Sequence, residues 1–184
     1  MKTMRNLFLS SMIGIFFLLS CTNTKQVSSF SISFSPHFKQ YKLQRLFFIP
    51  FQEDQKIFSS TLKDTLAKNK TWEIFFSPLP SSYPLSPSHI PASSLSYVAT
   101  KYNAHAIALG HISHFSLTPM RISLRWQIIS VYDGKILYSI EGTWEDKSIY
   151  SLDYQDIPQS ISGLSVEKFF SEVCLTIAEG LKNL

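Results

Sequence analysis

The stretch that decides the fold is RISLRWQIISVYDGKILYSIEGTW, residues 121–144. Apolar side chains alternate with polar ones on both sides of the Asp133–Gly134 pair. They are Ile122, Leu124, Trp126 and Ile128 before it and Ile136, Tyr138, Ile140 and Trp144 after it. A period of two predicts strands that are buried on one face, and an Asp-Gly pair between two such runs is a strong turn signal. Residues 120–132 and 135–144 are therefore predicted to form a β-hairpin against a hydrophobic core.

Further strands are predicted upstream of this hairpin. Residues 104–110, AHAIALG, form an almost continuous run of small and apolar side chains. Such a run is typical of a strand that is covered on both faces, and residues 112–117 extend it. Two shorter apolar runs, LQRLFFIPF at 43–51 and WEIFF at 72–76, are predicted strands as well.

Helices are predicted between and after these strands. Residues 57–69 place Phe58, Leu62 and Leu66 on one face, and residues 163–181 carry a longer apolar stripe. A shorter helix is predicted at 92–102. The residues of the stripe in 163–181 are Val166, Phe169, Phe170, Val173, Ile177 and Leu181.

The order of these elements predicts an α/β (α+β) sandwich. Its mixed sheet of about five strands ends in a C-terminal hairpin, and about three helices pack on it. Residues 77–91 hold five of the nine prolines and five serines. Proline removes a backbone donor, so this segment is predicted to be a loop, and long loops are often functional.

The N-terminus contains the run FFLLSC, residues 16–21. It could end a membrane-spanning helix, belong to a core helix or mark a cleavage point. The apolar part, 7–19, spans only ~20 Å as a helix, against ~30 Å for the hydrocarbon core of a bilayer. It also lacks the polar face of a core helix. Because Lys2 and Arg5 precede it, the segment is predicted to be a secretory signal.

The sequence Leu18-Leu19-Ser20-Cys21 resembles the lipobox of bacterial lipoproteins. The resemblance implies that Cys21 is joined to diacylglycerol, that the chain is cut before Cys21, and that a further acyl group such as palmitate is often added. Two or more acyl chains anchor a protein firmly. Thr22, where an inner-membrane lipoprotein would carry Asp, implies the periplasmic face of the outer membrane.

This resemblance divides the chain into a signal peptide at 1–20, a lipidated tether at 21–40 and a periplasmic α/β domain at 41–184. Within the tether, Phe30, Ile32 and Phe34 alternate with serines. The second half of the tether is therefore either flexible or an extended edge segment. With Cys21 acylated, Cys174 would have no disulfide partner, and its apolar helical surroundings predict a core position.

The segments YVATKYNAHAIALGHISHF (97–115) and SVYDGK (130–135) resemble a pattern found in envelope lipoprotein domains. It is shared by the curli secretion lipoproteins, the TolB amino-terminal domain, the LpoB-type activators of penicillin-binding proteins and the PelC-type exopolysaccharide lipoproteins. His105 and Ser130 stand where these families often carry Asp. The resemblance implies a binding or assembly role, with an envelope protein or a second copy as partner.

No residues with the spacing of a catalytic or cofactor site are evident. The sequence has no Gly-x-Ser-x-Gly elbow and no glycine-rich phosphate loop among its six glycines. His105, His111 and His114 are close in sequence, but on a regular strand His111 and His114 would point to opposite faces. We therefore expect no catalytic residue, no cofactor and no bound metal, although a tight turn at 111–114 would leave a metal site open.

Charge argues against nucleic-acid binding. The formal charge is +4, and without Lys2 and Arg5 it falls to +2, from 15 basic and 13 acidic residues. Binding to phosphate backbones requires clustered charge, which is absent. Arg121 and Arg125, together with Arg45, are predicted to form a polar sheet face that is either simply solvated or a contact surface for a partner.

We therefore expect an outer-membrane lipoprotein that acts as a non-catalytic scaffold or accessory subunit in envelope assembly or secretion. An activator that docks on a peptidoglycan synthase is the first alternative. A lipoprotein that binds a small ligand or a metal is the second.

Overall fold

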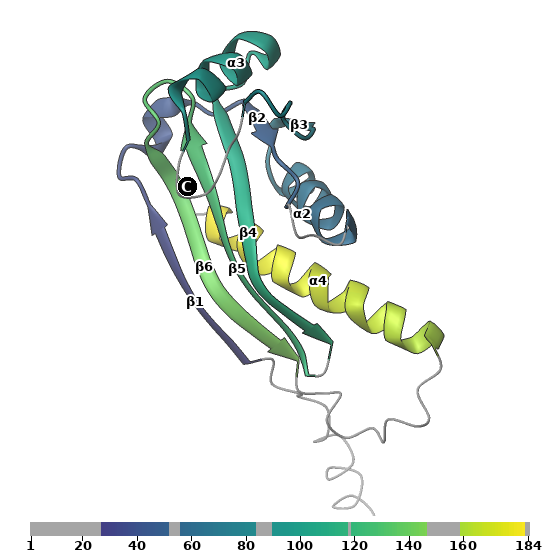
Figure 1. Ribbon diagram of the computed structural model, residues 1–184. Helices are drawn as coiled ribbons and strands as arrows, with labels where there is room; N and C mark the ends of the chain where they lie inside the picture. The colour runs from purple at the N-terminus through teal and green to yellow at the C-terminus, as the bar shows by residue number, and fades with distance from the viewer. Residues whose placement is uncertain (1–26, 52–55, 84–89, 118, 147–158, 183–184) are drawn as a thin grey trace, which may run out of the picture.

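The computed structural model describes residues 27–51, 56–83, 90–117, 119–146 and 159–182. These residues form one six-stranded sheet with helices on both faces (Figure 1). The elements are β1 (Val27–Phe34), the 3₁₀ turn η1 (Phe38–Tyr41), β2 (Arg45–Phe48), α2 (Lys56–Asn69), β3 (Glu73–Phe76), α3 (Ala92–Tyr102), β4 (Ala106–Leu117), β5 (Met120–Ser130), β6 (Ile136–Asp146) and α4 (Gln159–Lys182).

The predicted α+β class with a mixed sheet is confirmed. The strand order is β1-β6-β5-β4-β2-β3. Strands β2, β3 and β4 are mutually parallel, and β4, β5, β6 and β1 are antiparallel. Helix α2 connects β2 to β3 and α3 connects β3 to β4, on opposite faces of the sheet (Figure 1). Parallel neighbours need crossovers of this kind, whereas antiparallel neighbours need only turns.

The sixth strand, β1, lies within the segment 21–40. It pairs antiparallel with β6 over its whole length, from Val27 opposite Glu145 to Phe34 opposite Tyr138. Of the two alternatives that the alternation of Phe30, Ile32 and Phe34 left open, the extended edge segment is confirmed.

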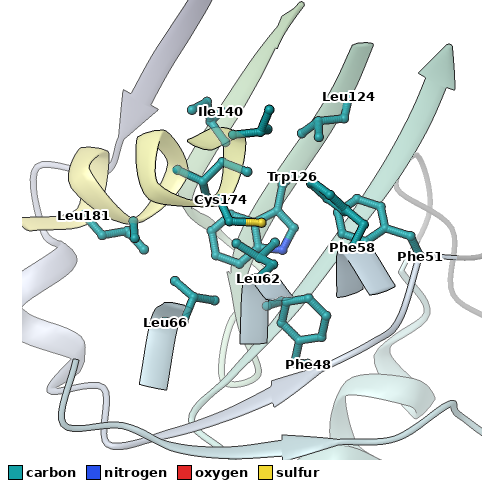
Figure 2. Close-up of a cluster of buried hydrophobic side chains, with 14 of the residues drawn as sticks. Phe48, Phe51, Phe58, Leu62, Leu66, Leu124, Trp126, Ile140, Cys174 and Leu181 are labelled. Atoms are coloured by element: carbon teal, nitrogen blue, oxygen red, sulfur yellow. The ribbon is translucent and has the colours of Figure 1, made fainter. Parts of the chain in front are cut away.

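One face of the sheet, here called the inner face, carries the main core. Helices α2 and α4 pack on it (Figure 2). Phe58, Leu62 and Leu66 of α2 are completely buried, as their spacing predicts. Cys174 of α4 is also buried among these side chains, which confirms its predicted core position. Strand β5 contributes Ile122, Leu124, Trp126 and Ile128 to this core from the inner face of the hairpin.

The other, outer face has a smaller core at one end only. There α3 covers Phe47 of β2, Ile107 of β4 and Ile129 of β5 through Leu95 and Val98. Strand β4 is therefore buried on both faces over its first half, as its continuous apolar run predicts. Beyond this patch the outer face of β1, β6, β5 and β4 carries polar side chains.

The hairpin turn forms where Asp133–Gly134 predicts it. Gly134 adopts φ +68°, a left-handed conformation that glycine adopts without strain, and its N–H donates to Ser130 O at 3.1 Å. Ser130 also makes a side-chain hydrogen bond in this turn. Its hydroxyl accepts the Tyr132 N–H at 3.2 Å, a bond that an Asp side chain makes equally well.

Asp133 links this turn to η1. Tyr41 Oη donates to Asp133 Oδ2 at 2.8 Å, and Lys135 Nζ lies 3.0 Å from the same oxygen. The hydrogen bond from Tyr41, followed by the bonds from Lys135 and Ser130, holds the pKa of the Asp133 carboxyl well below its usual range.

Asp133→Asn is therefore expected to destabilise the protein in a pH-dependent way. A lowered carboxyl pKa in the folded state stabilises that state above the ordinary carboxyl pKa of about 4. This contribution decreases as the pH falls from about 4 toward the lowered value. The test is the urea midpoint of unfolding, measured for both proteins at a series of pH values. The wild-type midpoint should exceed that of Asp133→Asn by its largest margin near pH 6, and the margin should shrink below pH 4. A difference that stays constant with pH would show that the charge of Asp133 is not what stabilises the turn.

Two sequence predictions are corrected by the structure. Helix α4 begins at Gln159, four residues before the predicted start at 163. His111 and His114 of β4 do not lie on opposite faces, because a β-bulge shifts the register between Ile112 and His114. The bulge adds one residue to β4 and reverses the face of every later side chain.

Candidate functional site

The candidate site is the uncovered part of the outer face, here called the polar sheet face. Its side chains lie in lateral rows, because residues that pair across antiparallel strands share a face. The central row runs from Ser31 of β1 through Glu141 of β6 and Arg125 of β5 to His111 of β4. The side chains of this face are Ser29, Ser31, Ser33, Ser139, Glu141, Thr143, Arg121, Ser123, Arg125, Gln127, His111, Ser113 and His114.

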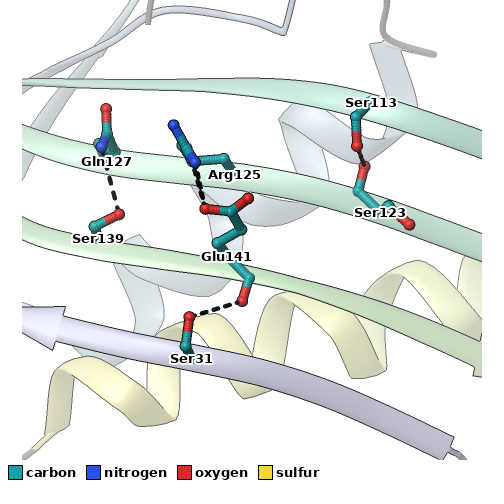
Figure 3. Close-up of polar contacts among 7 residues, drawn as sticks. All are labelled: Ser31, Ser113, Ser123, Arg125, Gln127, Ser139 and Glu141. Carbon is teal, nitrogen blue, oxygen red and sulfur yellow. Dashed lines mark hydrogen bonds and ion pairs between the residues drawn. The ribbon is translucent and has the colours of Figure 1, made fainter. Parts of the chain in front are cut away.

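An ion pair stands at the centre of this face (Figure 3). Arg125 donates from Nε to Glu141 Oε2 at 2.8 Å, and its Nη2 contacts the same oxygen. Both side chains are about half exposed. Exposed pairs of this kind contribute at most about 1 kcal/mol to stability. The pair therefore fixes the positions of two charged groups at the surface and adds little to the stability of the fold.

Short hydroxyl side chains surround the ion pair. Ser123 and Thr143 share a hydrogen bond of 2.8 Å between their hydroxyls. Ser113 donates to the Ser123 carbonyl at 3.2 Å, and Ser31 is directed at the Glu141 carbonyl at 3.5 Å (Figure 3). These side chains are short and bond to one another or to nearby backbone, so Arg125 and Glu141 project beyond the polar surface around them.

Gln127 is the buried polar group of this face. Its side chain is only 7% exposed, and its Nε2 makes one long bond of 3.4 Å to Ser139 Oγ. Its Oε1 is buried without a hydrogen-bond partner in the described part of the chain. A buried acceptor without a partner is destabilising, so Gln127 weakens the fold slightly at this place.

The face is hollowed into two open depressions that meet at Arg125 and Glu141. One, of about 730 Å³, lies over Ser29, Ser123 and Thr143. The other, of about 760 Å³, lies over Ser33 and Gln127. Small-molecule sites are usually enclosed, whereas both depressions are open to solvent. Their shape suits contact with a larger surface.

The predicted arginine face is confirmed in part. Arg121 and Arg125 both lie on the outer face of β5. Arg45 lies at the far end of the sheet, where it forms an ion pair of 2.8 Å with Glu73 of β3. The apolar patch under α3 separates Arg45 from the other two arginines.

The structure places two of the three histidines on one face of the sheet. The register places His111 opposite Arg125 and His114 opposite Ser123, both on the outer face. The side chain of His105 accepts the Gln44 N–H at 3.3 Å, beside the start of β2. The described residues contain no group of three or more His, Cys, Asp or Glu side chains that could hold a metal ion.

The lipidation site Cys21 and the signal segment 1–20 lie outside the described residues. No helix in the described ranges is long and apolar enough to cross a bilayer. The described ends of the loop 77–91 contain neither helix nor strand. Tyr83 stacks on Tyr97 of α3, with ring centroids 4.0 Å apart, and this contact holds one end of the loop against α3.

The contributions of β1 and Gln127 could not be located from the sequence. The serines of β1 join the face only because β1 pairs with β6, far away along the chain. Their alternation with Phe30, Ile32 and Phe34 was the available signal. The burial of Gln127 depends on its position at the margin of the apolar patch, which no local pattern shows.

Comparison with known proteins identifies the fold. No model of a protein family matches the chain, and no curated protein has a significantly similar sequence. Among solved structures, the chain is similar to a PelC dodecamer from Paraburkholderia phytofirmans, with 12% sequence identity and a TM-score of 0.51. The similarity covers 81% of this chain and 96% of that chain. It confirms, for the fold, the likeness to PelC-type domains that the sequence predicts.

Two further solved structures align with lower scores. Lipoprotein GNA1162 from Neisseria meningitidis is 11% identical with a TM-score of 0.43, over 70% of this chain and 95% of that chain. The hypothetical protein CT253 from Chlamydia trachomatis is 11% identical with a TM-score of 0.48, over 77% of this chain and 99% of that chain. The resemblances to the curli, TolB and LpoB-type domains stay predictions.

Proposed function

We propose that this protein is a lipid-anchored, non-catalytic accessory subunit of an envelope assembly or secretion apparatus. Cys21 holds it at the periplasmic face of the outer membrane. A protein partner docks on the polar sheet face.

The observation that carries this proposal is the unequal covering of the two faces of the sheet. In the described residues, α2 and α4 cover the inner face, while α3 covers only one end of the outer face. The open part presents the ion pair of Arg125 and Glu141 and the short hydroxyl groups around it. Protein contact surfaces combine such polar groups with arginine anchors, and Arg125 and Arg121 are the arginines of this face.

The docking face can be located by crosslinking in intact cells. A photoreactive residue replaces Arg121 on the polar sheet face, and a matched one replaces Lys68, which is equally basic but lies exposed on α2. We expect a specific adduct from position 121 and none from position 68, because only position 121 adjoins the proposed contact. Equal capture from both positions, or none from 121, would contradict the docking face.

The captured molecule distinguishes the two leading functions. The crosslinked partner is identified by mass spectrometry. If it is a component of a secretion or assembly apparatus, the accessory role is supported. A peptidoglycan synthase as the single adduct would indicate the activator instead.

The anchor is tested separately in the same cells. Cys21→Ala is expected to remain uncleaved and to lose lipid attachment, because the cysteine is both the acylated residue and the first residue after the cut. Membrane fractionation and the size of the mature chain measure this change. An unchanged size and unchanged membrane partition would contradict the lipoprotein assignment and leave the docking face standing.

A further inference from the structure

Strand β1 is an edge strand without the usual protection of an edge. Its sequence, VSSFSISF, has no charged residue and no proline over eight residues. Its register with β6 runs without a bulge. Natural edge strands are usually short, charged, bulged or interrupted by proline, since an open edge can pair with another chain. The opposite edge strand, β3, follows this rule with only four residues.

The backbone groups on the free side of β1 can be assigned. The Ser35 N–H donates to Leu137 O at 2.9 Å. Alternate residues of an antiparallel strand bond to the same neighbour, so Ser33, Ser31 and Ser29 bond to β6. The N–H and C=O groups of the intervening residues point to the free edge, where the described part of the chain has no further strand. These residues are Ser28, Phe30, Ile32 and Phe34.

The side chains of β1 also remain partly uncovered. Phe30, Ile32 and Phe34 lie on the inner face with exposed fractions of 43%, 37% and 59%. Helix α4 approaches this row at Gly180, where an added Cβ would lie 2.8 Å from Ile32 Cδ1. An edge with three partly exposed apolar side chains and unpaired backbone groups favours pairing with a further strand.

We propose that β1 pairs antiparallel with β1 of a second copy of this chain, centred on Ser31. In this register Ser28 faces Phe34 of the second copy and Phe30 faces Ile32. In this register the free backbone groups of Ser28, Phe30, Ile32 and Phe34 all form hydrogen bonds with the second copy. Shifting the strands along each other would leave some of these groups unpaired. The inference does not rest on the lipid anchor or on the proposed partner.

The pairing is compatible with both faces of the sheet. In β1 the even-numbered residues lie on the inner face and the odd-numbered ones on the outer face. The proposed register pairs even with even and odd with odd, so the inner and outer faces of the two sheets line up. Apolar side chains then lie beside apolar ones on the inner face, and serines lie beside serines on the outer face. No charges oppose each other, because β1 carries none. The two copies are related by a two-fold axis perpendicular to the sheet at Ser31, the isologous contact that is commonest among homodimers.

Cysteine crosslinking tests the register. The full chain carries Cys21→Ser and is purified in mild detergent. Its other cysteine, Cys174, is buried, so an introduced surface cysteine is the thiol that reacts. Ser31 faces itself across the axis as a non-hydrogen-bonded pair, with Cα atoms ~4.5 Å apart, which a disulfide can bridge. We expect Ser31→Cys to give covalent dimers on mild oxidation.

Two neighbouring positions serve as matched controls. Ser29 and Ser33 face each other between copies, so Ser29→Cys and Ser33→Cys should each stay monomeric alone. Their mixture should give a mixed dimer. Equal dimer yields from all three single variants, or no dimer from Ser31→Cys, would overturn the proposed pairing.

A second variant tests the backbone bonds without a thiol. Ser28→Pro removes an outward N–H, and the two-fold axis doubles the loss, while the bonds to β6 remain. We expect the dissociation constant of the dimer, from sedimentation over a concentration series, to rise by roughly tenfold. The thermal midpoint of the fold at low concentration should stay unchanged. An unaltered dissociation constant, or a chain that is monomeric throughout, contradicts the proposal.

Discussion

Trp126→Ala is expected to lower the free energy of unfolding by roughly 3–5 kcal/mol, the range measured when large buried aromatic side chains are removed. Trp126 is completely buried on the inner face of β5. Its ring lies 6.3 Å from that of Phe48 and 5.9 Å from that of Tyr138, measured between centroids. Removing it leaves a cavity in the core between the sheet and helices α2 and α4 (Figure 2). Urea denaturation followed by circular dichroism measures the loss.

The adjacent residue provides the control. Arg125 is next to Trp126 in the chain but lies on the polar sheet face, so Arg125→Ala should cost less than about 1 kcal/mol. Trp126→Phe should fall between the two, since it keeps one aromatic ring and removes an indole N–H that has no hydrogen-bond partner in the described residues. Similar losses for Trp126→Ala and Arg125→Ala would contradict the assignment of the two faces.

Gly142→Ala is expected to cost about 3 kcal/mol and to loosen β1 from β6. A Cβ at Gly142 would lie 2.4 Å from Phe30 Cβ and 2.7 Å from Ser29 O. The second of these atoms belongs to the backbone of β1, which cannot move without breaking its pairing. Overpacking typically costs about 1–3 kcal/mol, and a contact with backbone belongs at the upper end. Hydrogen exchange should show faster exchange in β1 than in β4 and β5.

Gly180→Ala is the matched control for this substitution. Its Cβ would meet Tyr138 Oη and Ile32 Cδ1, which are atoms of side chains and not of the backbone. Alanine also favours the helix by about 1 kcal/mol relative to glycine. We expect a clearly smaller loss at Gly180, and an equal loss at both glycines would mean that the β1 backbone is not the obstacle.

The hairpin and the helices were predictable because their signals are local. The alternation around Asp133–Gly134 and the spacing of Phe58, Leu62 and Leu66 each lie within a window of a few turns or residues. The buried strand at Ala106 was predictable for the same reason. Local patterns do not reveal the order of the strands in the sheet. The position of β1 beside β6 follows from that order and was therefore not predicted.

The candidate site was predictable only in part for a related reason. Alternation in β5 correctly placed Arg121 and Arg125 on one face. It could not place Arg45, because the position of β2 along that face depends on tertiary packing. The bulge near His114 escaped prediction as well, since no glycine or proline marks it.

The pairing of β1 with β6 also has a consequence for how the chain acquires its fold. Phe34 pairs with Tyr138, the smallest separation in this pair of strands, which exceeds one hundred positions. Strand β1 is therefore the first strand to be made, but it waits for its neighbour until β6 (Ile136–Asp146), the last strand, has been made. Contacts this distant in sequence form slowly, and an uncharged alternating segment that waits unpaired is prone to aggregate. The strand with the least protection along its edge is thus also exposed for the longest time before folding.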